Sequence, residues 1–158
     1  MKEKVNKYMQ MAIDLAKENA VSAGGGPFGA VIVMNDEVVS ASSNSVTPDN
    51  DPTAHAEVNA IRAACRKLNT FNLSGCTLYT SCEPCPMCLS AAYWARIDKI
   101  YFSAGREDAH DAGFSDAFLY KELSLPLEER TIPIERSLES EGLEPFKLWV
   151  NNNSKVPY

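Results

Sequence analysis

The sequence predicts a layered α/β domain whose sheet begins with an antiparallel pair of strands. Short β-rich runs alternate with segments of helical spacing along the chain, which is the pattern of this fold class. The first two of these runs are separated by only three turn-forming residues, as in a hairpin. A chain of 158 residues with 45% hydrophobic positions can bury one substantial core but not two, so we expect one domain over residues 1–158.

The elements of the first third follow from periodicity and turn chemistry. Apolar residues recur at helical spacing over residues 4–20, and this helix ends at the glycine run 24–26. Because no Gly-Lys-Ser/Thr follows this run, we interpret it as a flexible bend and not as a phosphate-binding loop. Residues 30–34 and 38–41 are predicted strands of the hairpin, and residues 47–53 a polar loop.

The later elements alternate in type. Helices are expected over residues 54–68, 85–94 and 115–121, and strands over residues 78–80 and 99–103. A further strand is expected around Ile132-Pro133-Ile134, where the proline places it at an edge of the sheet or makes it irregular. The final segment, residues 142–158, carries an apolar patch that must dock somewhere.

Charge and cysteine content exclude several classes of function. A net charge of −6 argues against a nucleic-acid partner, since such binding draws its affinity from Lys and Arg. A small neutral substrate fits better. No stretch approaches the roughly 20 apolar residues that span a bilayer, so no membrane partner and no export are expected. The odd number of cysteines, five, is a poor disulfide framework and favours metal ligation in a reducing cytoplasm.

Two short motifs carry the candidate chemistry. His55-Ala56-Glu57 supplies an imidazole, and Cys85 and Cys88 supply two thiolates, all three suited to zinc. Both groups lie at predicted helix starts, where the helix N-terminus favours thiolate over thiol. Zinc that only holds a fold normally has four protein ligands, whereas three ligands plus water is the catalytic arrangement. Glu57 is then the expected proton carrier.

The remaining cysteines and the second histidine receive plainer interpretations. Cys82 precedes the helix and is read as a packed, reduced thiol without a ligand role. Cys65 and Cys76 are expected to be buried and inert. His110, among acidic neighbours in a polar loop, is expected to be solvated.

H-x-E followed by P-C-x-x-C is the motif pair of the zinc deaminases, in which the Glu is the acid/base and not a ligand. At these residues the sequence resembles the cytidine/deoxycytidylate deaminase superfamily, and within it the bacterial guanine deaminases, over nearly the whole chain. The resemblance is carried by GPFGAVIV at 26–33, NDPTAHAE at 50–57, LYTSCEPCPMC at 78–88, AGFSD at 112–116 and the terminal Tyr158. Ser115 departs from the acidic residue expected beside Asp116.

This resemblance implies a cytidine-deaminase-like α/β/α sandwich around a five-stranded mixed sheet. It also implies one Zn²⁺ per subunit, held by His55, Cys85 and Cys88, and a homodimer in which residues 142–158 are exchanged between subunits. The implied reaction is hydrolysis of guanine to xanthine and ammonia, with Glu57 and Asp116 moving protons. The implied substrate contacts are Phe28, Asn44, Ala56, Trp94, Asp116 and Tyr158.

Other functions stay open on the sequence alone. The metal motifs are shared by deaminases of other small substrates, such as guanosine and cytosine, because pocket shape selects the ring. A tRNA adenosine deaminase is opposed by the net charge and by the lack of a cluster of positive residues in 142–158. A non-catalytic zinc module is opposed by the open fourth ligand position and by Glu57.

Overall fold

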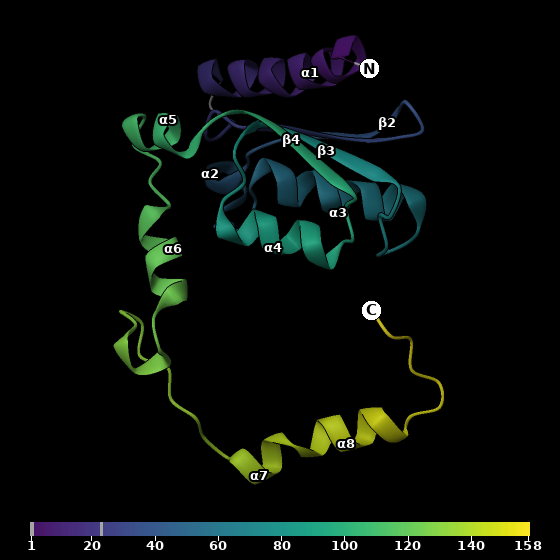
Figure 1. The fold of residues 1–158 in the computed structure, drawn as a ribbon, viewed down its shortest axis with the longest axis vertical. Coiled ribbons are helices and arrows are strands. Elements are labelled where there is room, and N and C mark those ends of the chain that lie inside the picture. Colours follow the sequence, from purple (N-terminus) through teal and green to yellow (C-terminus); the bar gives the residue numbers. More distant parts are fainter. Residues whose placement is uncertain (1, 23) are drawn as a thin grey trace. The chain divides into compact units, whose positions relative to one another are not determined.

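The computed structural model describes residues 2–22 and 24–158 and divides into two compact units (Figure 1). The first unit runs to Ala117 and contains the sheet and all the elements that carry the metal motifs. The second unit runs from Phe118 to Tyr158. Each unit is described by itself below.

A mixed sheet forms the centre of the first unit. Its strands are β1 (Gly29–Met34), β2 (Glu37–Ser43), β3 (Cys76–Cys82) and β4 (Lys99–Ala104), in the order β2-β1-β3-β4. β1 is antiparallel to β2 and to β3, and β3 is parallel to β4. Asn35 and Asp36 link β1 to β2 with positive φ angles of 50° and 64°, a conformation that Asn and Asp tolerate. The predicted hairpin is therefore confirmed.

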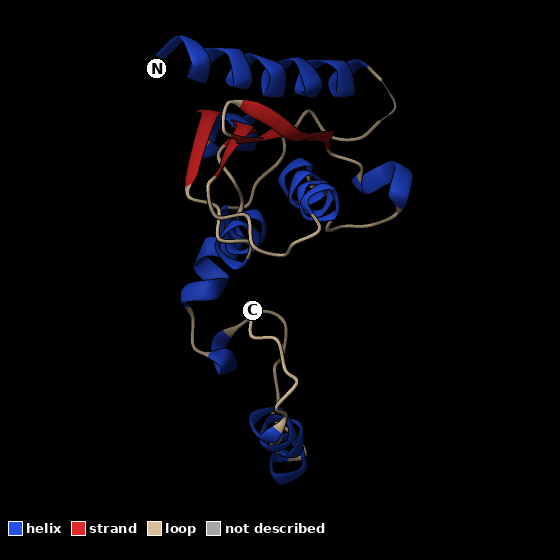
Figure 2. Cartoon of the chain, turned by 90° about the vertical axis from the view of Figure 1, so that its right-hand side faces the viewer, coloured by secondary structure: helices blue, strands red, loops and turns tan. Residues whose placement is uncertain are grey.

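One face of the sheet is covered by α1 (Lys2–Val21). Tyr8 and Ala12 of this helix form a buried cluster with Val31 and Val33 of β1 and with Tyr79 of β3. Alternate residues of a strand point to opposite faces, so this cluster uses every second position of β1. α1 thereby forms the first layer of the unit, as Figure 2 shows.

The opposite face is covered by α3 (Ala56–Leu68) and α4 (Pro86–Trp94), which complete the helix-sheet-helix layering (Figure 2). The intervening positions of β1, Ala30 and Ile32, pack here with Leu78 of β3 and with small residues of both helices. Short side chains such as Ala60 let the helices lie close to the strands. This packing fixes the first turns of α3 and α4, where the metal motifs are located.

Two connecting segments complete the first unit. Residues 47–53, predicted as a loop, overlap a short helix, α2 (Val46–Asp49), whose Pro48 falls in the first turn, where a missing backbone N–H costs nothing. α5 (Arg106–Asp111) follows β4 directly.

The second unit consists of short helices. α6 (Ala117–Ser124) enters it and is followed by a 3₁₀ turn (Leu127–Glu129), α7 (Glu139–Gly142) and α8 (Glu144–Asn151). The strand predicted around Ile132-Pro133-Ile134 is wrong, since these residues form no ladder and Pro133 has no N–H to donate to one. The described residues accordingly form a sheet of four strands and not five. One domain over residues 1–158, with 142–158 exchanged between subunits, stays a prediction.

None of the helices in the described part of the chain combines the length and the apolar character needed to cross a membrane.

Candidate metal and catalytic site

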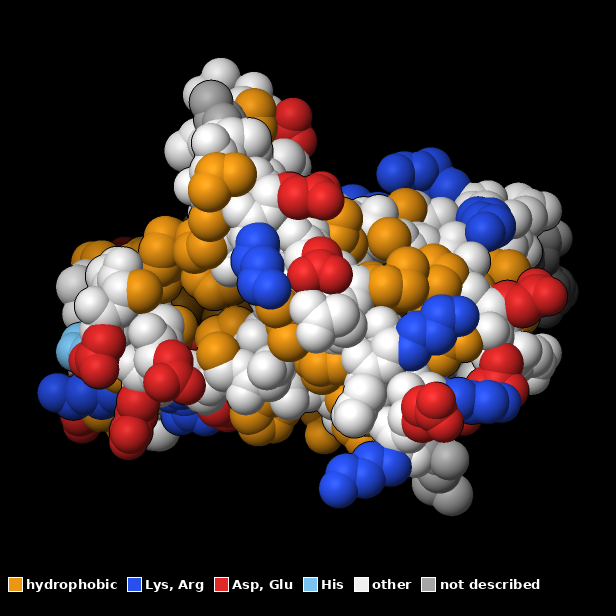
Figure 3. All heavy atoms as spheres, turned by 90° about the horizontal axis from the view of Figure 1, so that it is seen from above, with side chains coloured by type: hydrophobic (Ala, Val, Ile, Leu, Met, Phe, Trp, Pro, Cys, Tyr) orange, Lys and Arg blue, Asp and Glu red, His pale blue; other side chains and the backbone are white. Residues whose placement is uncertain are grey.

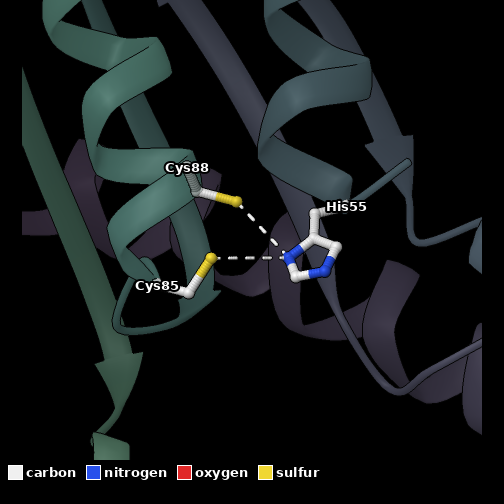
Figure 4. Close-up of side chains that lie close together, drawn as sticks. All are labelled: His55, Cys85 and Cys88. Atoms are coloured by element: carbon white, nitrogen blue, oxygen red, sulfur yellow. Dashed lines mark hydrogen bonds between the residues drawn. The ribbon is translucent and has the colours of Figure 1, made fainter. Parts of the chain in front are cut away.

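The two motifs meet at the heads of neighbouring helices, as Figure 4 shows. His55 is the residue that immediately precedes α3, and Cys85 holds the same position before α4. Both have extended backbone there, with ψ angles of 153° and 168°, which turns their side chains toward each other. Cys88 lies one turn into α4 and is fully buried. The three ligand atoms all lie within 4.8 Å of one another.

The spacing of these atoms fits a tetrahedral metal ion. Bonds of about 2.1 Å to nitrogen and 2.3 Å to sulfur at tetrahedral angles place the two ligand atoms about 3.6 Å apart. The Nδ1 atom of His55 lies 3.6 Å from Sγ of Cys85 and 3.5 Å from Sγ of Cys88. The donor set of one imidazole and two thiols is the one that zinc prefers. The geometry and the chemistry of the residues therefore fit zinc with a fourth position left for another ligand.

Electrostatics prepare one thiol for ligation. Hydrogen bonding by the Cys88 thiol, and then by His55, lowers the pKa of Cys85 to about 4, so this sulfur is a thiolate at neutral pH. The hydrogen bond to Cys85 and burial raise the pKa of Cys88, because the pair shares one proton. Cys88 would lose that proton on coordinating a cation, since a coordinating thiol is deprotonated.

Glu57 lies beside this cluster as a buried carboxyl group. Only 6% of the residue is exposed, and burial raises its pKa above the ordinary value of 4.5. Its Oε1 accepts a hydrogen bond of 3.1 Å from Oγ1 of Thr80 on β3, and its Oε2 lies 3.5 Å from Sγ of Cys88. A buried carboxyl group of raised pKa next to a metal cage is suited to taking up and releasing a proton.

Thr80 is a site residue that sequence reasoning missed. It is 1% exposed, and the sequence predicts it only as part of the strand over 78–80. The sequence signal that could have revealed it is the alternation of side chains between the two faces of β3. Leu78 and Thr80 share the face that packs on α3, and a polar residue on that face needs a hydrogen-bond partner.

Phe28 and Asn44 lie side by side, just before β1 and just after β2. The backbone N–H of Asn44 donates to the carbonyl of Phe28 at 3.1 Å, and Asn44 is 6% exposed. Its Oδ1 accepts from the N–H groups of Gly26 at 3.1 Å and Val46 at 3.2 Å. The Phe28 ring meets Phe114 edge to face, with centroids 5.0 Å apart. Among the residues that the structure describes, both partners of Oδ1 are thus backbone N–H groups, which leaves the Nδ2 donor of Asn44 for another molecule.

Asp116 has a buried oxygen that lacks a partner among the described residues. Its Oδ1 is inaccessible and accepts no hydrogen bond there. Burial, followed by the negative charge of Cys85, raises the pKa of this carboxyl group. An orphaned carboxylate oxygen that senses the charge of Cys85 is a candidate acceptor for N–H groups of a substrate.

The remaining predicted substrate contacts are Ala56, Trp94 and Tyr158. Ala56 is fully buried and begins α3, between His55 and Glu57. Trp94 ends α4, roughly 9 Å along the helix axis from Cys88 at the 1.5 Å rise of an α-helix, and its side chain is 67% exposed. Tyr158 belongs to the second unit, so its role as a contact stays a prediction.

Cys82 and His110, for which no metal role is predicted, lie outside the three-residue cluster. Cys82 is buried, and its thiol donates to the carbonyl of Gly105 at 3.7 Å. It also lines a cavity of about 360 Å³ whose lining does not include His55, Cys85 or Cys88. His110 is exposed on α5.

Residues 2–104 match the model of the cytidine and deoxycytidylate deaminase zinc-binding region. The guanine deaminase of Bacillus subtilis is 50% identical over 151 residues, which is 96% of this chain and 97% of that protein. A crystal structure of guanine deaminase from the same organism has a TM-score of 0.95 and covers 97% of this chain and 98% of its own. A tRNA-specific adenosine deaminase of Aquifex aeolicus is 48% identical over 97 residues, 61% of this chain and 64% of that protein.

Proposed function

Because the chain belongs to the cytidine and deoxycytidylate deaminase family, we propose that it is a zinc-dependent enzyme that hydrolyses guanine to xanthine and ammonia. The observation that carries this proposal is the cluster of His55, Cys85 and Cys88 with the buried carboxyl group of Glu57 beside it. The near full-length similarity to a guanine deaminase supports the choice of substrate within the family.

His55, Cys85 and Cys88 would hold one zinc ion per subunit. When bound, zinc supplies a Lewis acid and an activated water molecule at neutral pH. The protein's own part is to fix the three ligands on two packed helices and to keep the fourth position free of side chains.

Glu57 moves the protons of the reaction. Thr80 holds its Oε1, which leaves Oε2, on the side of Cys88, to accept a proton from the attacking water. The same carboxyl group delivers this proton to a ring nitrogen of the base. It then takes the second proton of the former water from the newly added hydroxyl group and passes it to the departing amine, so that guanine and water give xanthine and ammonia. Acid/base groups of this kind contribute about 10²- to 10⁴-fold to a rate.

Recognition of the base uses complementary hydrogen bonds. Asn44 can only donate, because its Oδ1 is occupied by two backbone N–H groups, so it suits the carbonyl oxygen or a ring nitrogen of guanine. Asp116 can accept from the N–H groups of the base, and the Phe28 ring can pack on its face. The backbone of Ala56 would lie near the ring.

A homodimer in which residues 142–158 of one subunit reach the site of the other is also proposed. The exposed Trp94 at the end of α4 and the exposed Tyr158 at the end of the chain support it, because each is a large aromatic side chain suited to a protein or substrate contact. A cytoplasmic location stays a prediction.

A tRNA adenosine deaminase is the alternative that the metal site alone leaves open. The net charge of −6 disfavours a polyanionic substrate. Acidic and basic side chains are interspersed on the face seen in Figure 3, and the described side chains gather into no broad basic patch on that face. A small base is the substrate that this charge distribution favours.

The decisive experiment is an ammonia-release assay on the zinc-loaded protein with guanine, guanosine, adenine, cytosine and a tRNA anticodon hairpin in parallel. Turnover of guanine alone is the expected result. Preference for another small base would mean that the substrate contacts were assigned wrongly. Activity on the hairpin alone would overturn the charge argument, and no activity on any of them would favour a structural zinc module.

A further inference from the structure

Asn19, near the end of α1, makes contacts that none of the roles assigned so far explains. It is a polar residue on a helix, yet it is 7% exposed. Its Nδ2 donates to the carbonyl of Gly26 at 2.6 Å and to the backbone carbonyl of Asn44 at 2.8 Å. One side-chain amide therefore joins α1 to both of the segments that carry the proposed recognition residues.

These two segments are already hydrogen-bonded to each other. The N–H of Gly26 donates to Oδ1 of Asn44 at 3.1 Å, and the N–H of Asn44 donates to the carbonyl of Phe28 at 3.1 Å. Asn19 closes these contacts into a ring of hydrogen bonds, because it donates to the backbone carbonyl oxygens of both Gly26 and Asn44. With Oδ1 of Asn44 engaged in this ring, its amide group is held in one orientation and its Nδ2 remains as the donor.

The glycine run allows this ring to form. Gly25 has a φ of +127°, and a Cβ atom on it would lie 2.5 Å from the backbone oxygen of Asn44 and 2.9 Å from its Oδ1. Only glycine fits this approach. The run that the sequence suggested to be a flexible bend thus also serves close packing between Gly25 and Asn44.

We propose that Asn19 is a positioning residue for substrate recognition, which acts by fixing the orientation of the Asn44 amide. This inference rests on the proposed function, since it assigns Asn44 to the bound base. Aspartate has nearly the same shape but no N–H to donate, and its carboxylate would face two carbonyl oxygens. Asn19 therefore acts through its two donors and not through its volume.

The test compares Asn19→Asp and Asn19→Ala with Glu18→Gln, a control at the adjacent, exposed position of α1. Loss of one hydrogen bond to the base corresponds to a rise in KM of about 10-fold. We expect this rise in both Asn19 variants, with kcat within about threefold, full zinc content and no change in the control. If the Asn19→Asp variant fails to fold, the comparison with the control rests on Asn19→Ala alone.

A double-mutant cycle with Asn44→Ala separates positioning from a general structural effect. If Asn19 acts through Asn44, adding Asn19→Ala to Asn44→Ala raises KM no further. Additive effects, or an unchanged KM in Asn19→Ala, would overturn the inference.

A failure of the proposed function can be distinguished from a failure of the inference about Asn19, because it appears as the absence of guanine turnover in the wild-type protein. The cycle is then measured on the base that is turned over. Without any turnover, it is measured as the guanine dissociation constant of the zinc-loaded Glu57→Gln protein and of its Asn19 variants. Dissociation constants that Asn19→Ala leaves unchanged, or an absence of guanine binding, would count against the inference.

Discussion

Replacing Thr80 by valine removes one hydrogen bond from the proposed proton carrier and preserves the shape of the core. Thr80 is 1% exposed, and its Oγ1 lies 3.1 Å from Oε1 of Glu57. An ionised carboxylate has no hydrogen to donate, so in the active state the threonine must be the donor. Valine exchanges the hydroxyl for a methyl group of similar size.

The size of the effect follows from the strength of that bond. A hydrogen bond to a charged group contributes about 1.5–3 kcal/mol, and 1.36 kcal/mol corresponds to a tenfold change in an acid dissociation constant. Thr80→Val should therefore raise the pKa of Glu57 by about 1 to 2, in the same direction in which burial already raises it. Because Glu57 must be ionised to accept a proton from water, activity on the acid side of the pH profile is lost first.

The assay is the pH dependence of kcat/KM for guanine, measured on zinc-loaded proteins. The acid limb of Thr80→Val should lie at higher pH than that of the wild type, by about the same 1 to 2 pH units. Thr80→Ser keeps the hydroxyl and should restore the original limb, and Thr77→Val, a half-buried position on the same strand, should leave it unchanged. Superimposable profiles for Thr80→Val and the wild type, at equal zinc content, would refute the assignment.

Other perturbations test the site, the core and the tail. Glu57→Ala should bind zinc normally yet lose about 10²- to 10⁴-fold in turnover, as metal analysis and ammonia release would reveal; undiminished turnover would contradict the role of Glu57. Burial, followed by the charge of Glu57, raises the pKa of Cys82 to about 11, so mass spectrometry should find this thiol unalkylated at pH 8, where about one part in 10³ is thiolate. Rapid alkylation at that pH would argue against burial. Leu78→Ala, at a fully buried position of the core, should lower the free energy of unfolding by about 2–5 kcal/mol in urea titrations, and a smaller loss would indicate that the core collapses around the gap. Removal of residues 142–158 should keep zinc but abolish guanine turnover, and a fully active truncated protein would exclude the tail from the site.

The central fold could be predicted from sequence because its signals are local. The hairpin turn at Asn35 and Asp36, the apolar run of β1 and the helical spacing of α3 each depend on a few neighbouring residues. The clustering of the three proposed metal ligands was equally readable, since both motifs have fixed internal spacing and lie at helix starts. Prediction failed around Pro133, where a short apolar run lacks both a donor and a partner strand.

The contacts that support the site could not be read in the same way. Thr80 meets Glu57 across 23 positions of sequence, and Asn19 meets Asn44 across 25. Each looks like an ordinary residue of its strand or helix, because its partner is chosen only when the sheet and helices pack. Burial of a polar side chain is the sign by which the structure reveals them.

Secondary-structure elements and connecting loops contribute different parts of the proposed site, and this separation has an evolutionary consequence. The proposed ligands and proton carrier are held by the starts of α3 and α4 and by β3, all anchored in one core, whereas Phe28, Asn44 and Asp116 lie on connections outside helices and strands. Substitutions in those connections can alter the preferred base without disturbing the metal cage, because loops tolerate change that packed elements do not. New substrate preferences can therefore arise in this architecture while the reaction itself is inherited unchanged.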